Sequence, residues 1–297
     1  MTPEVSVVVT CFNYGRFVAG CLSSIQTQTF QNFEVIVVDD GSTDNSEEQI
    51  VPFLKDKRFK YIKQHNGGQA NAKNRGIQET TGKYIAFLDA DDLWENNKLE
   101  KQLDLFKNPV VGVVYSLARL INESGEEQEF NFLGEYTRPQ SRKVSRWLIL
   151  DNFVWFSSAV VRRKCLDEFG CFDETLKMGI DWDLWLKIST KYEFDYVEEP
   201  LIAYRVGHSG QMSKNVETRQ KCSDLIMERF LNNYPESVEK KTISEAYYNT
   251  YCNRGNFFRN LDKQKSYKFY IKAIIMKPFK RNAYKGLVKN LINYKSD

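Results

Sequence analysis

The first 88 residues alternate short apolar runs with amphipathic segments, and this pattern restricts the fold more than any other feature of the chain. The apolar runs are rich in β-branched residues, which predicts strands over residues 5–11, 33–40, 59–64 and 84–88. Apolar residues at helical spacing between them predict helices over residues 15–28, 44–54 and 69–80. Regular strand–helix alternation predicts an α/β fold with a mostly parallel central sheet flanked by helices.

Polar side chains directly follow or end three of the predicted strands. Asn13 and Tyr14 come after the first strand, Asp40 ends the second, and Asp89 and Asp91 follow the fourth. Ligands of such sheets bind at the carboxyl ends of the strands. Because these ends meet at one edge, the sequence predicts a nucleotide site there.

The fourth strand ends in three carboxylates, those of Asp89, Asp91 and Asp92. Like charges this close repel one another unless a cation or solvent screens them, and Mg²⁺ or Mn²⁺ prefers oxygen ligands of this kind. This favours a metal–diphosphate site at the strand end. A solvated acidic turn that caps the next helix is the alternative, since so short a motif also occurs by accident.

The composition limits the function classes. With 297 residues, of which 42% are hydrophobic and 27% charged, the chain is long enough for one large domain plus an appendage. A net charge of +3 gives no argument for nucleic-acid binding. The six cysteines form no Cys-x-x-Cys pair, so we expect buried thiols in a reducing cytosol. No apolar run is long enough to span a membrane and no signal peptide is apparent, so we expect a cytoplasmic protein, either soluble or peripheral on the inner face of the membrane.

The middle of the chain continues the sheet. Its patterns predict a helix over 96–107, a strand over 110–116, a polar insertion over 118–141, a short helix over 144–150, a strand over 155–162 and two short strands over 192–204. Asp181 opens a further apolar helix, where it is either an N-cap or a general base, and the residue type alone favours the cap. A lone histidine such as His208 is more often structural than a ligand.

The C-terminal part changes character, because helical spacing without strand patterns runs through residues 213–297. From Asp262 onward there are nine Lys and one Arg against two Asp, with aromatic residues interleaved. These features predict an all-helical extension with a basic outer face. Either that face is simply solvated, or it docks on anionic lipid.

Five segments, in order, resemble hallmarks of the inverting family-2 glycosyltransferases. They are residues 5–14 (VSVVVTCFNY), 35–44 (VIVVDDGSTD), 66–76 (NGGQANAKNRG), 82–92 (GKYIAFLDADD) and 181–187 (DWDLWLK). The resemblance covers residues 4–210 and implies an A-type glycosyltransferase fold, a nucleotide-sugar donor and a divalent cation, Mn²⁺ or Mg²⁺. Residues 1–212 would then form the catalytic domain, with a nucleotide-sugar half (1–117) and an acceptor half (118–212), and 213–297 the extension.

The resemblance also implies roles for individual residues. The nucleotide-binding residues would be Thr10, Phe12, Tyr14, Asp40, Gly67, Lys73, Arg75, Asp89 and Ala90. Asp91 and His208 would contact the metal, and Asp181 would be the catalytic base. The family usually writes this base as Glu-Asp, whereas this chain has Ile180 before Asp181.

The resemblance implies metal-dependent transfer of a sugar from a nucleoside-diphosphate sugar of the UDP type to a hydroxyl of a glycan or glycolipid acceptor, as in bacterial-type cell-surface polysaccharide synthesis. Two other function classes stay open. The missing Glu at position 180 allows a catalytically silent sugar-nucleotide-binding scaffold. A nucleotidyltransferase also uses acidic strand ends and a metal, but it normally needs a Gly-rich, basic triphosphate loop, and no such loop precedes the first predicted helix.

Overall fold

The computed structural model describes residues 2–129, 138–208, 210 and 215–292. The chain divides into two compact units, Met1–Val144 with Asn152–Tyr234, and Ser145–Asp151 with Pro235–Asp297. The first unit therefore includes helix α8 (Val216–Asn233), which lies beyond the predicted boundary at residue 212. None of the helices in the described part of the chain is long and apolar enough to cross a lipid bilayer.

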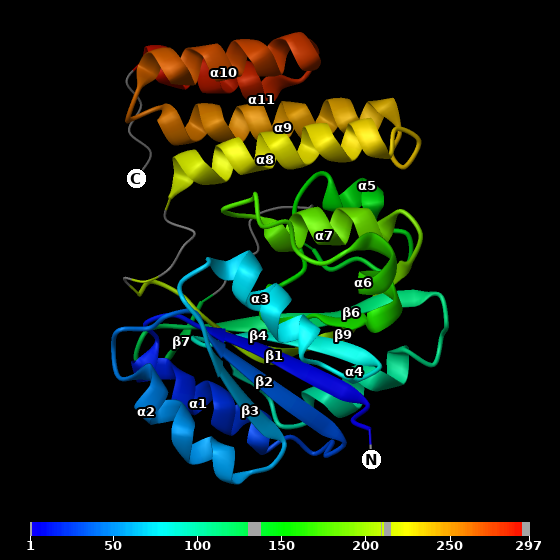
Figure 1. The fold of residues 1–297 in the computed structure, drawn as a ribbon. Helices are drawn as coiled ribbons and strands as arrows, with labels where there is room; N and C mark the ends of the chain where they lie inside the picture. The colour runs from blue at the N-terminus through cyan, green and yellow to red at the C-terminus, as the bar shows by residue number, and fades with distance from the viewer. Residues whose placement is uncertain (1, 130–137, 209, 211–214, 293–297) are drawn as a thin grey trace. The chain divides into compact units, whose positions relative to one another are not determined.

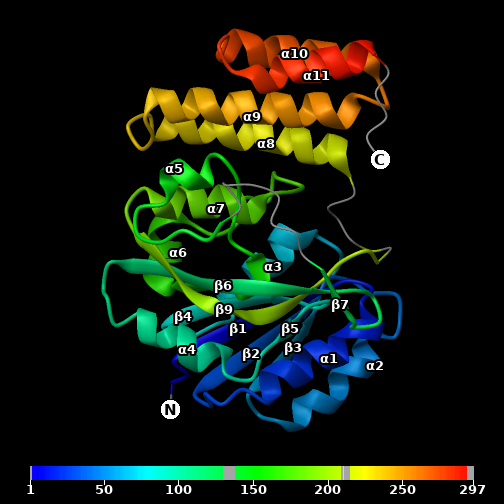
Figure 2. The same ribbon diagram turned by 180° about the vertical axis from the view of Figure 1, so that it is seen from behind.

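The first unit is built on one mixed sheet (Figures 1 and 2). Among the described residues its strand order is β3-β2-β1-β4-β8-β6-β9-β5, and β7 pairs with β6. The strands are β1 (Val5–Cys11), β2 (Phe33–Asp39), β3 (Phe59–Lys63), β4 (Tyr84–Asp89), β5 (Leu93–Trp94), β6 (Val111–Ile121), β7 (Glu127–Gln128), β8 (Val160–Arg162) and β9 (Glu193–Arg205). The β1–β4 strands are parallel to one another, as predicted, and β8 joins β4 in antiparallel orientation.

Helices cover both faces of this sheet (Figures 1 and 2). They are α1 (Gly15–Gln26), α2 (Ser46–Ile50), α3 (Gln69–Gln78), α4 (Lys98–Leu105), α6 (Arg163–Phe169) and α7 (Ile180–Ser189), with 3₁₀ turns at Val51–Lys55 and Phe156–Ser158. Alternate side chains of one strand point to opposite faces. Val35 and Val37 accordingly pack in the core with α1, whereas Ile36 and Val38 pack against Ala72 of α3. The strands are buried on both faces, which explains their unbroken apolar runs.

Several predicted elements differ from the structure. The two strands expected over 192–204 are one strand, β9, which bulges where Pro200 pairs with Leu117, because proline cannot donate a ladder hydrogen bond. The strand expected over 155–162 is a 3₁₀ turn followed by the short β8. Part of the expected insertion at 118–141 is regular, since it contains the end of β6 and strand β7, while residues 130–137 lie outside the described residues.

The second unit is helical, as predicted for the extension. It contains α5 (Ser145–Leu148), α9 (Lys240–Phe258), α10 (Lys263–Met276) and α11 (Arg281–Leu291). Tyr270 of α10 lies at its centre and is 1% exposed. A Cβ atom at Gly255 of α9 or Gly286 of α11 would lie within 2.7 Å or 2.2 Å of the Tyr270 ring. The two glycines thus allow α9 and α11 to approach the tyrosine closely.

Candidate active site

The register of the parallel strands brings predicted nucleotide-binding residues to one edge of the sheet. Thr10 of β1 pairs with Asp89 of β4, and Cys11 pairs with Asp39 of β2. Asp40 follows Asp39 directly, and its backbone N–H donates to the carbonyl of Cys11. The carboxyl ends of β1, β2 and β4 therefore meet, which is where a sheet of this kind binds its ligand.

Lys73 of α3 connects two of these strand ends. Its side chain is nearly buried, and Nζ donates to Asp89 Oδ1 at 2.7 Å and to Thr10 Oγ1 at 3.1 Å. The same Nζ lies 4.5 Å from the centre of the Phe156 ring, a favourable cation–π distance. The ammonium group therefore compensates the charge of Asp89 and keeps that carboxylate beside Thr10.

Asp91 and His208 lie together although 117 residues separate them. His208 Nε2 is 2.9 Å from Asp91 Oδ2, and the imidazole is fully buried. The edge of the Tyr14 ring packs against this imidazole, with ring centres 5.6 Å apart, and the Tyr14 hydroxyl donates to the carbonyl of Gly210. Burial raises the pKa of Asp91, and the charge of Asp89 adds to the effect. A cation at this position would relieve that repulsion.

The carboxylate and the imidazole at this edge are groups that could hold a divalent cation. Among the described residues no group of three or more His, Cys, Asp or Glu side chains has the arrangement of a self-contained metal site. Mg²⁺ is commonly held by one or two carboxylates while phosphate oxygens and water supply the rest. Asp91 and His208 would be the protein groups that hold the cation here.

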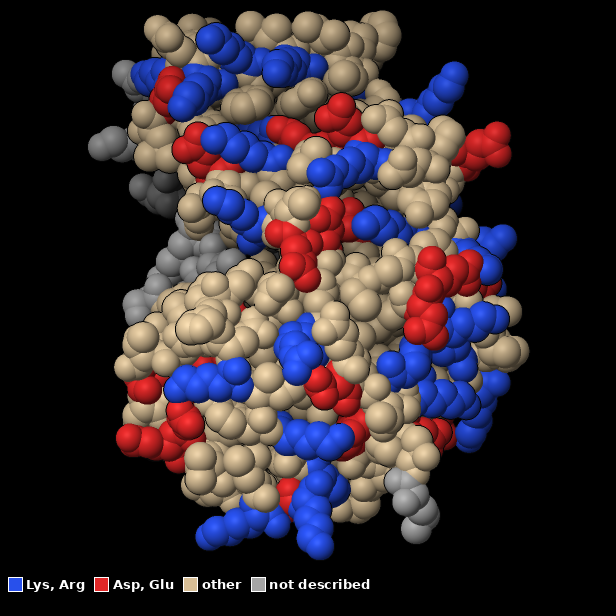
Figure 3. All heavy atoms as spheres, viewed as in Figure 1, with Lys and Arg blue, Asp and Glu red and all other residues tan. Residues whose placement is uncertain are grey.

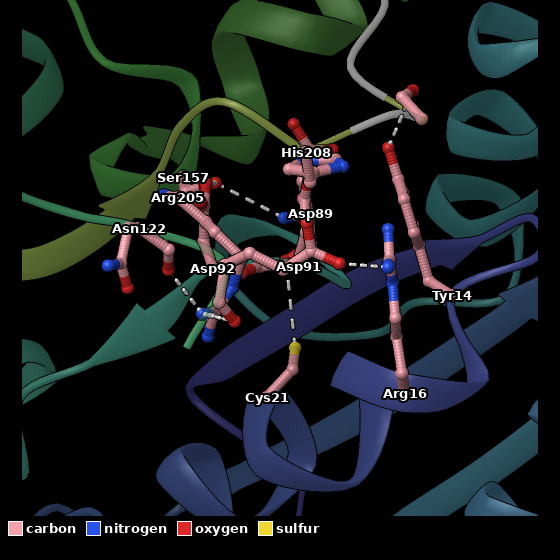
Figure 4. A network of polar contacts seen from close by, with 12 residues as sticks. Tyr14, Arg16, Cys21, Asp89, Asp91, Asp92, Asn122, Ser157, Arg205 and His208 are labelled. Atoms are coloured by element: carbon pink, nitrogen blue, oxygen red, sulfur yellow. Dashed lines mark hydrogen bonds and ion pairs between the residues drawn. The ribbon is translucent and has the colours of Figure 1, made fainter. Parts of the chain in front are cut away.

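Asp92 and Arg205 are buried and belong to the network of polar contacts around the acidic turn (Figure 4). Asp92 accepts hydrogen bonds from the Ser157 hydroxyl at 2.5 Å and from the Arg205 backbone N–H at 2.8 Å. The Arg205 guanidinium donates to the carbonyls of Asp91, Asn122 and Glu123 at 2.8–2.9 Å. Burial, followed by the charges of Asp91 and Asp89, raises the pKa of Asp92 well above its ordinary value. Asp92 is thus a structural member of the turn.

Asp40 organises the loop before α3. Its carboxylate accepts hydrogen bonds from the backbone N–H groups of Gly67 and Gly68 at 2.8 and 2.9 Å and from Gln64 Nε2 at 2.8 Å. Phe12, at the neighbouring strand end, keeps 45% of its surface exposed. An exposed ring beside a fixed carboxylate can offer a base both a stacking surface and a polar contact.

Asp181 does not cap its helix. The N-cap of α7 is Gly179, with φ +74°, and no side chain makes a capping hydrogen bond there. Asp181 lies in the first turn and its Oδ2 accepts a hydrogen bond from Asn152 Nδ2 at 2.8 Å. Burial raises the pKa of Asp181, so its carboxylate is more basic than an exposed one. Asp181 is therefore not the N-cap residue of α7, although its carboxylate accepts backbone N–H groups of the first turn.

Comparison with known proteins now decides the family. The sequence model of glycosyl transferase family 2 matches residues 6–170. The chain belongs to this family. An uncharacterized glycosyltransferase of Rickettsia felis is 28% identical over 247 residues, which is 82% of this chain and 41% of the relative. The chain therefore spans about two fifths of the length of that relative.

The fold agrees with family membership. The structure of Staphylococcus aureus TarS 1–349 in complex with UDP-GlcNAc superposes with a TM-score of 0.71 at 19% identity, covering 98% of this chain and 89% of that one. The mannosyltransferase PcManGT of Pyrobaculum calidifontis, in complex with GDP-Man and Mn²⁺, gives a TM-score of 0.63 at 17% identity over 99% and 89% of the two chains. The predicted A-type glycosyltransferase fold is confirmed.

The structure brings together most, but not all, of the residues assigned from the family-2 pattern. Thr10, Tyr14, Lys73, Asp89, Asp91 and His208 are linked by the contacts described above, and Asp40 contacts Gly67. Ala90 is fully buried within the acidic turn. Arg75 is placed differently, because it lies on the exposed side of α3 and pairs with Glu79 at 2.7 Å. Its prediction as a site-facing residue is not supported by this arrangement.

The sequence analysis assigned no site role to Asn152, Ser157 or Arg205, and it did not predict that Asp92 is buried. Their partners are 29 to 114 residues away in the sequence. The sequence gives a signal for one of them, Arg205, because it follows the apolar run 201–203 at the end of β9, where a charged residue needs a partner.

Proposed function

We propose that this family-2 protein is a metal-dependent, inverting glycosyltransferase that moves a sugar from a nucleoside-diphosphate sugar, most simply a UDP-sugar, to a hydroxyl of a glycan or lipid-linked acceptor. The observation that carries the proposal is the Asp91–His208 pair at 2.9 Å beside Asp89, at the edge where β1, β2 and β4 end. The UDP-GlcNAc complex of TarS and the GDP-Man and Mn²⁺ complex of PcManGT support a nucleotide-sugar donor and a divalent cation.

In this proposal each residue of the site has a separate role in the reaction. Asp40, Phe12 and Thr10 hold the nucleoside, and Asp91 with His208 would hold the cation. A bound cation would neutralise the charge that develops on the departing diphosphate. Asp181 takes the proton of the attacking hydroxyl as the oxocarbenium-like sugar is captured from the opposite face. A single displacement of this kind inverts the anomeric carbon.

The raised pKa of Asp181 suits this task, because a more basic carboxylate is a better proton acceptor. Activity would require the ionised form, so transfer should increase as the pH rises through that raised pKa. The silent-scaffold alternative predicts no such pH dependence. The nucleotidyltransferase alternative would use the same acidic edge, but it normally needs a Gly-rich, basic triphosphate loop, and no such loop precedes α1 in the sequence.

The direct test of the metal assignment is calorimetry of UDP binding with and without Mn²⁺. Asp91→Asn keeps the shape of the side chain but removes its negative charge, so Mn²⁺-dependent UDP affinity should fall at least 10-fold while the melting temperature stays within a few degrees of wild type. Asp104→Asn, at an exposed carboxylate of α4, is the matched control and should bind normally. Unchanged Mn²⁺-dependent affinity in Asp91→Asn would remove the metal from the proposal.

We further propose that the second unit contacts an anionic membrane surface that carries the acceptor. Residues 263–292 contain eight Lys and one Arg and no Asp or Glu. On the face drawn in Figure 3, Lys and Arg side chains lie among uncharged ones over α10. Exposed apolar side chains accompany them, namely Ile271, Ile275, Phe279, Val288 and Leu291. Basic and apolar groups on one helical surface favour the headgroup region of anionic lipid.

Sedimentation with vesicles tests the membrane contact. Replacing Lys285 and Lys289 by Gln should weaken binding to phosphatidylserine-containing vesicles about 30-fold, at about 1 kcal/mol per lysine. The exposed Lys55 and Lys57 of the first unit, replaced by Gln, are the control pair. Equal sedimentation with neutral and anionic vesicles, or none with either, would show that the basic helices have another role.

A further inference from the structure

Asn152 makes the closest described side-chain contact of the inferred base. Its Nδ2 donates to Asp181 Oδ2 at 2.8 Å, while its Oδ1 accepts the backbone N–H of Val154 at 3.3 Å. The second contact fixes the amide plane, so that the N–H₂ end is directed at the carboxylate. The backbone N–H groups of Asp181 and Trp182, at the start of α7, also stabilise the anion.

We propose that Asn152 is the positioning residue of the catalytic base, holding one carboxylate oxygen of Asp181 so that the other faces the acceptor hydroxyl. This inference rests on the proposed function, since it requires Asp181 to be the base. Position 180, where the family usually has Glu, is a buried Ile here, so no side-chain carboxylate comes from the preceding residue. Asn152 supplies the support from a distant segment of the same unit.

A neutral donor is chemically appropriate for this role. An amide N–H orients a carboxylate oxygen without the charge of Lys or Arg, either of which would strongly lower the basicity of the carboxylate. The nearest cation on the same helix, Lys187, is occupied by Asp183 at 2.5 Å. Asp89 is the charged group that acts on Asp181 across the site, and its negative charge raises the pKa further. Asp181 is thus held in place yet remains basic.

The first experiment needs no substrate. In ¹³C-carboxyl NMR titrations of the full chain, with the Asp181 signal assigned from its loss in Asp181→Asn, Asn152→Ala should move the titration of Asp181 to higher pH. Asn152→Asp should move it further, because a second carboxylate disfavours the anion. Asn74→Ala is the matched control, since Asn74 Nδ2 donates to the carboxylate of Glu174 at a similar 2.9 Å. It should leave Asp181 unchanged.

The second experiment separates positioning from simple stabilisation. With UDP-GlcNAc, Mn²⁺ and water as the acceptor, Asn152→Ala should lower kcat for UDP release roughly 10-fold and shift its acid limb to higher pH, with KM changed less than 2-fold. Asn74→Ala should keep the wild-type kcat. A normal kcat and pH profile in folded Asn152→Ala, or an unmoved Asp181 titration, would overturn the inference.

The failure of the inference and that of the proposed function are distinguishable. A fully active Asp181→Asn, or a wild-type protein that releases no nucleoside diphosphate from any of a set of UDP- and GDP-sugars, would contradict the proposed function. An inactive Asp181→Asn beside an unaffected Asn152→Ala would contradict only the role of Asn152.

Discussion

Replacing Asp181 by Asn separates the two roles that its position in the sequence allows. Asn has nearly the same shape, and its single amide oxygen can still accept the hydrogen bond from Asn152 Nδ2, so α7 should remain intact. It cannot accept a proton, however. If Asp181 is the base, acceptor-dependent transfer should therefore fall while the donor still binds.

The magnitude follows from the loss of general-base catalysis, which contributes about 10²- to 10⁴-fold, or about 2.7–5.4 kcal/mol of activation free energy. Asn152 Nδ2 now faces an amide instead of an anion, so a charge-assisted hydrogen bond becomes a neutral one. The free energy of unfolding should change by no more than about 1 kcal/mol, because removing a buried charge offsets part of that loss.

The assay is turnover of the variant beside its donor affinity and melting temperature. From the sequence, Asp183 would be a mild control, because it lies on another face of the helix. The structure changes this expectation, since Asp183 is buried and pairs with Lys187. Asp183→Asn is therefore the stability control: its melting temperature should fall, while turnover per folded molecule persists.

Two results would refute the reasoning. An Asp181→Asn protein with wild-type turnover would show that another group takes the proton. An Asp183→Asn protein that is folded yet less active than Asp181→Asn would place the base two residues further along α7.

Two further predictions concern the residues that hold the acidic turn. Lys73→Met removes the cation paired with Asp89, so Mn²⁺-free UDP binding measured by calorimetry should weaken about 10-fold, and an unchanged affinity would contradict the pairing. Arg205→Met leaves the carbonyls of Asp91 and Glu123 without the guanidinium donor, so the free energy of unfolding measured in urea should fall by about 3 kcal/mol, and a loss under 1 kcal/mol would contradict this role of Arg205.

The strands that carry the nucleotide site were predictable because their signals are local. The ends of β1, β2 and β4 agree with the prediction within one residue, because polar residues follow each apolar run directly and mark the end of the strand. Arg75 could have been placed correctly as well. Ala72, Lys73 and Gly76 form the buried side of α3, and Arg75 lies off that side.

The buried contacts that hold the site residues in place were not predictable, because they join segments that are distant in the sequence. The Asn152–Asp181 hydrogen bond joins a loop to α7, and Arg205 at the end of β9 reaches the carbonyl of Asp91. The same holds for Asp44, at the start of the helix predicted over 44–54. Its carboxylate accepts the N–H of Gly15 at the start of α1 as well as that of Ser46. The spacing of neighbouring residues in the sequence does not indicate such long-range pairings.

The central claim, that this chain transfers sugars, is tested most directly by following the products of nucleotide-sugar turnover. The purified protein, incubated with Mn²⁺ and a set of UDP- and GDP-sugars, should slowly release nucleoside diphosphate and free sugar even without an acceptor, and Asp91→Asn should release neither. Binding of these donors without turnover would support a scaffold. Release of pyrophosphate, in a parallel assay with a nucleoside triphosphate and a sugar phosphate, would support a nucleotidyltransferase. Either result would contradict the claim that the chain transfers sugars.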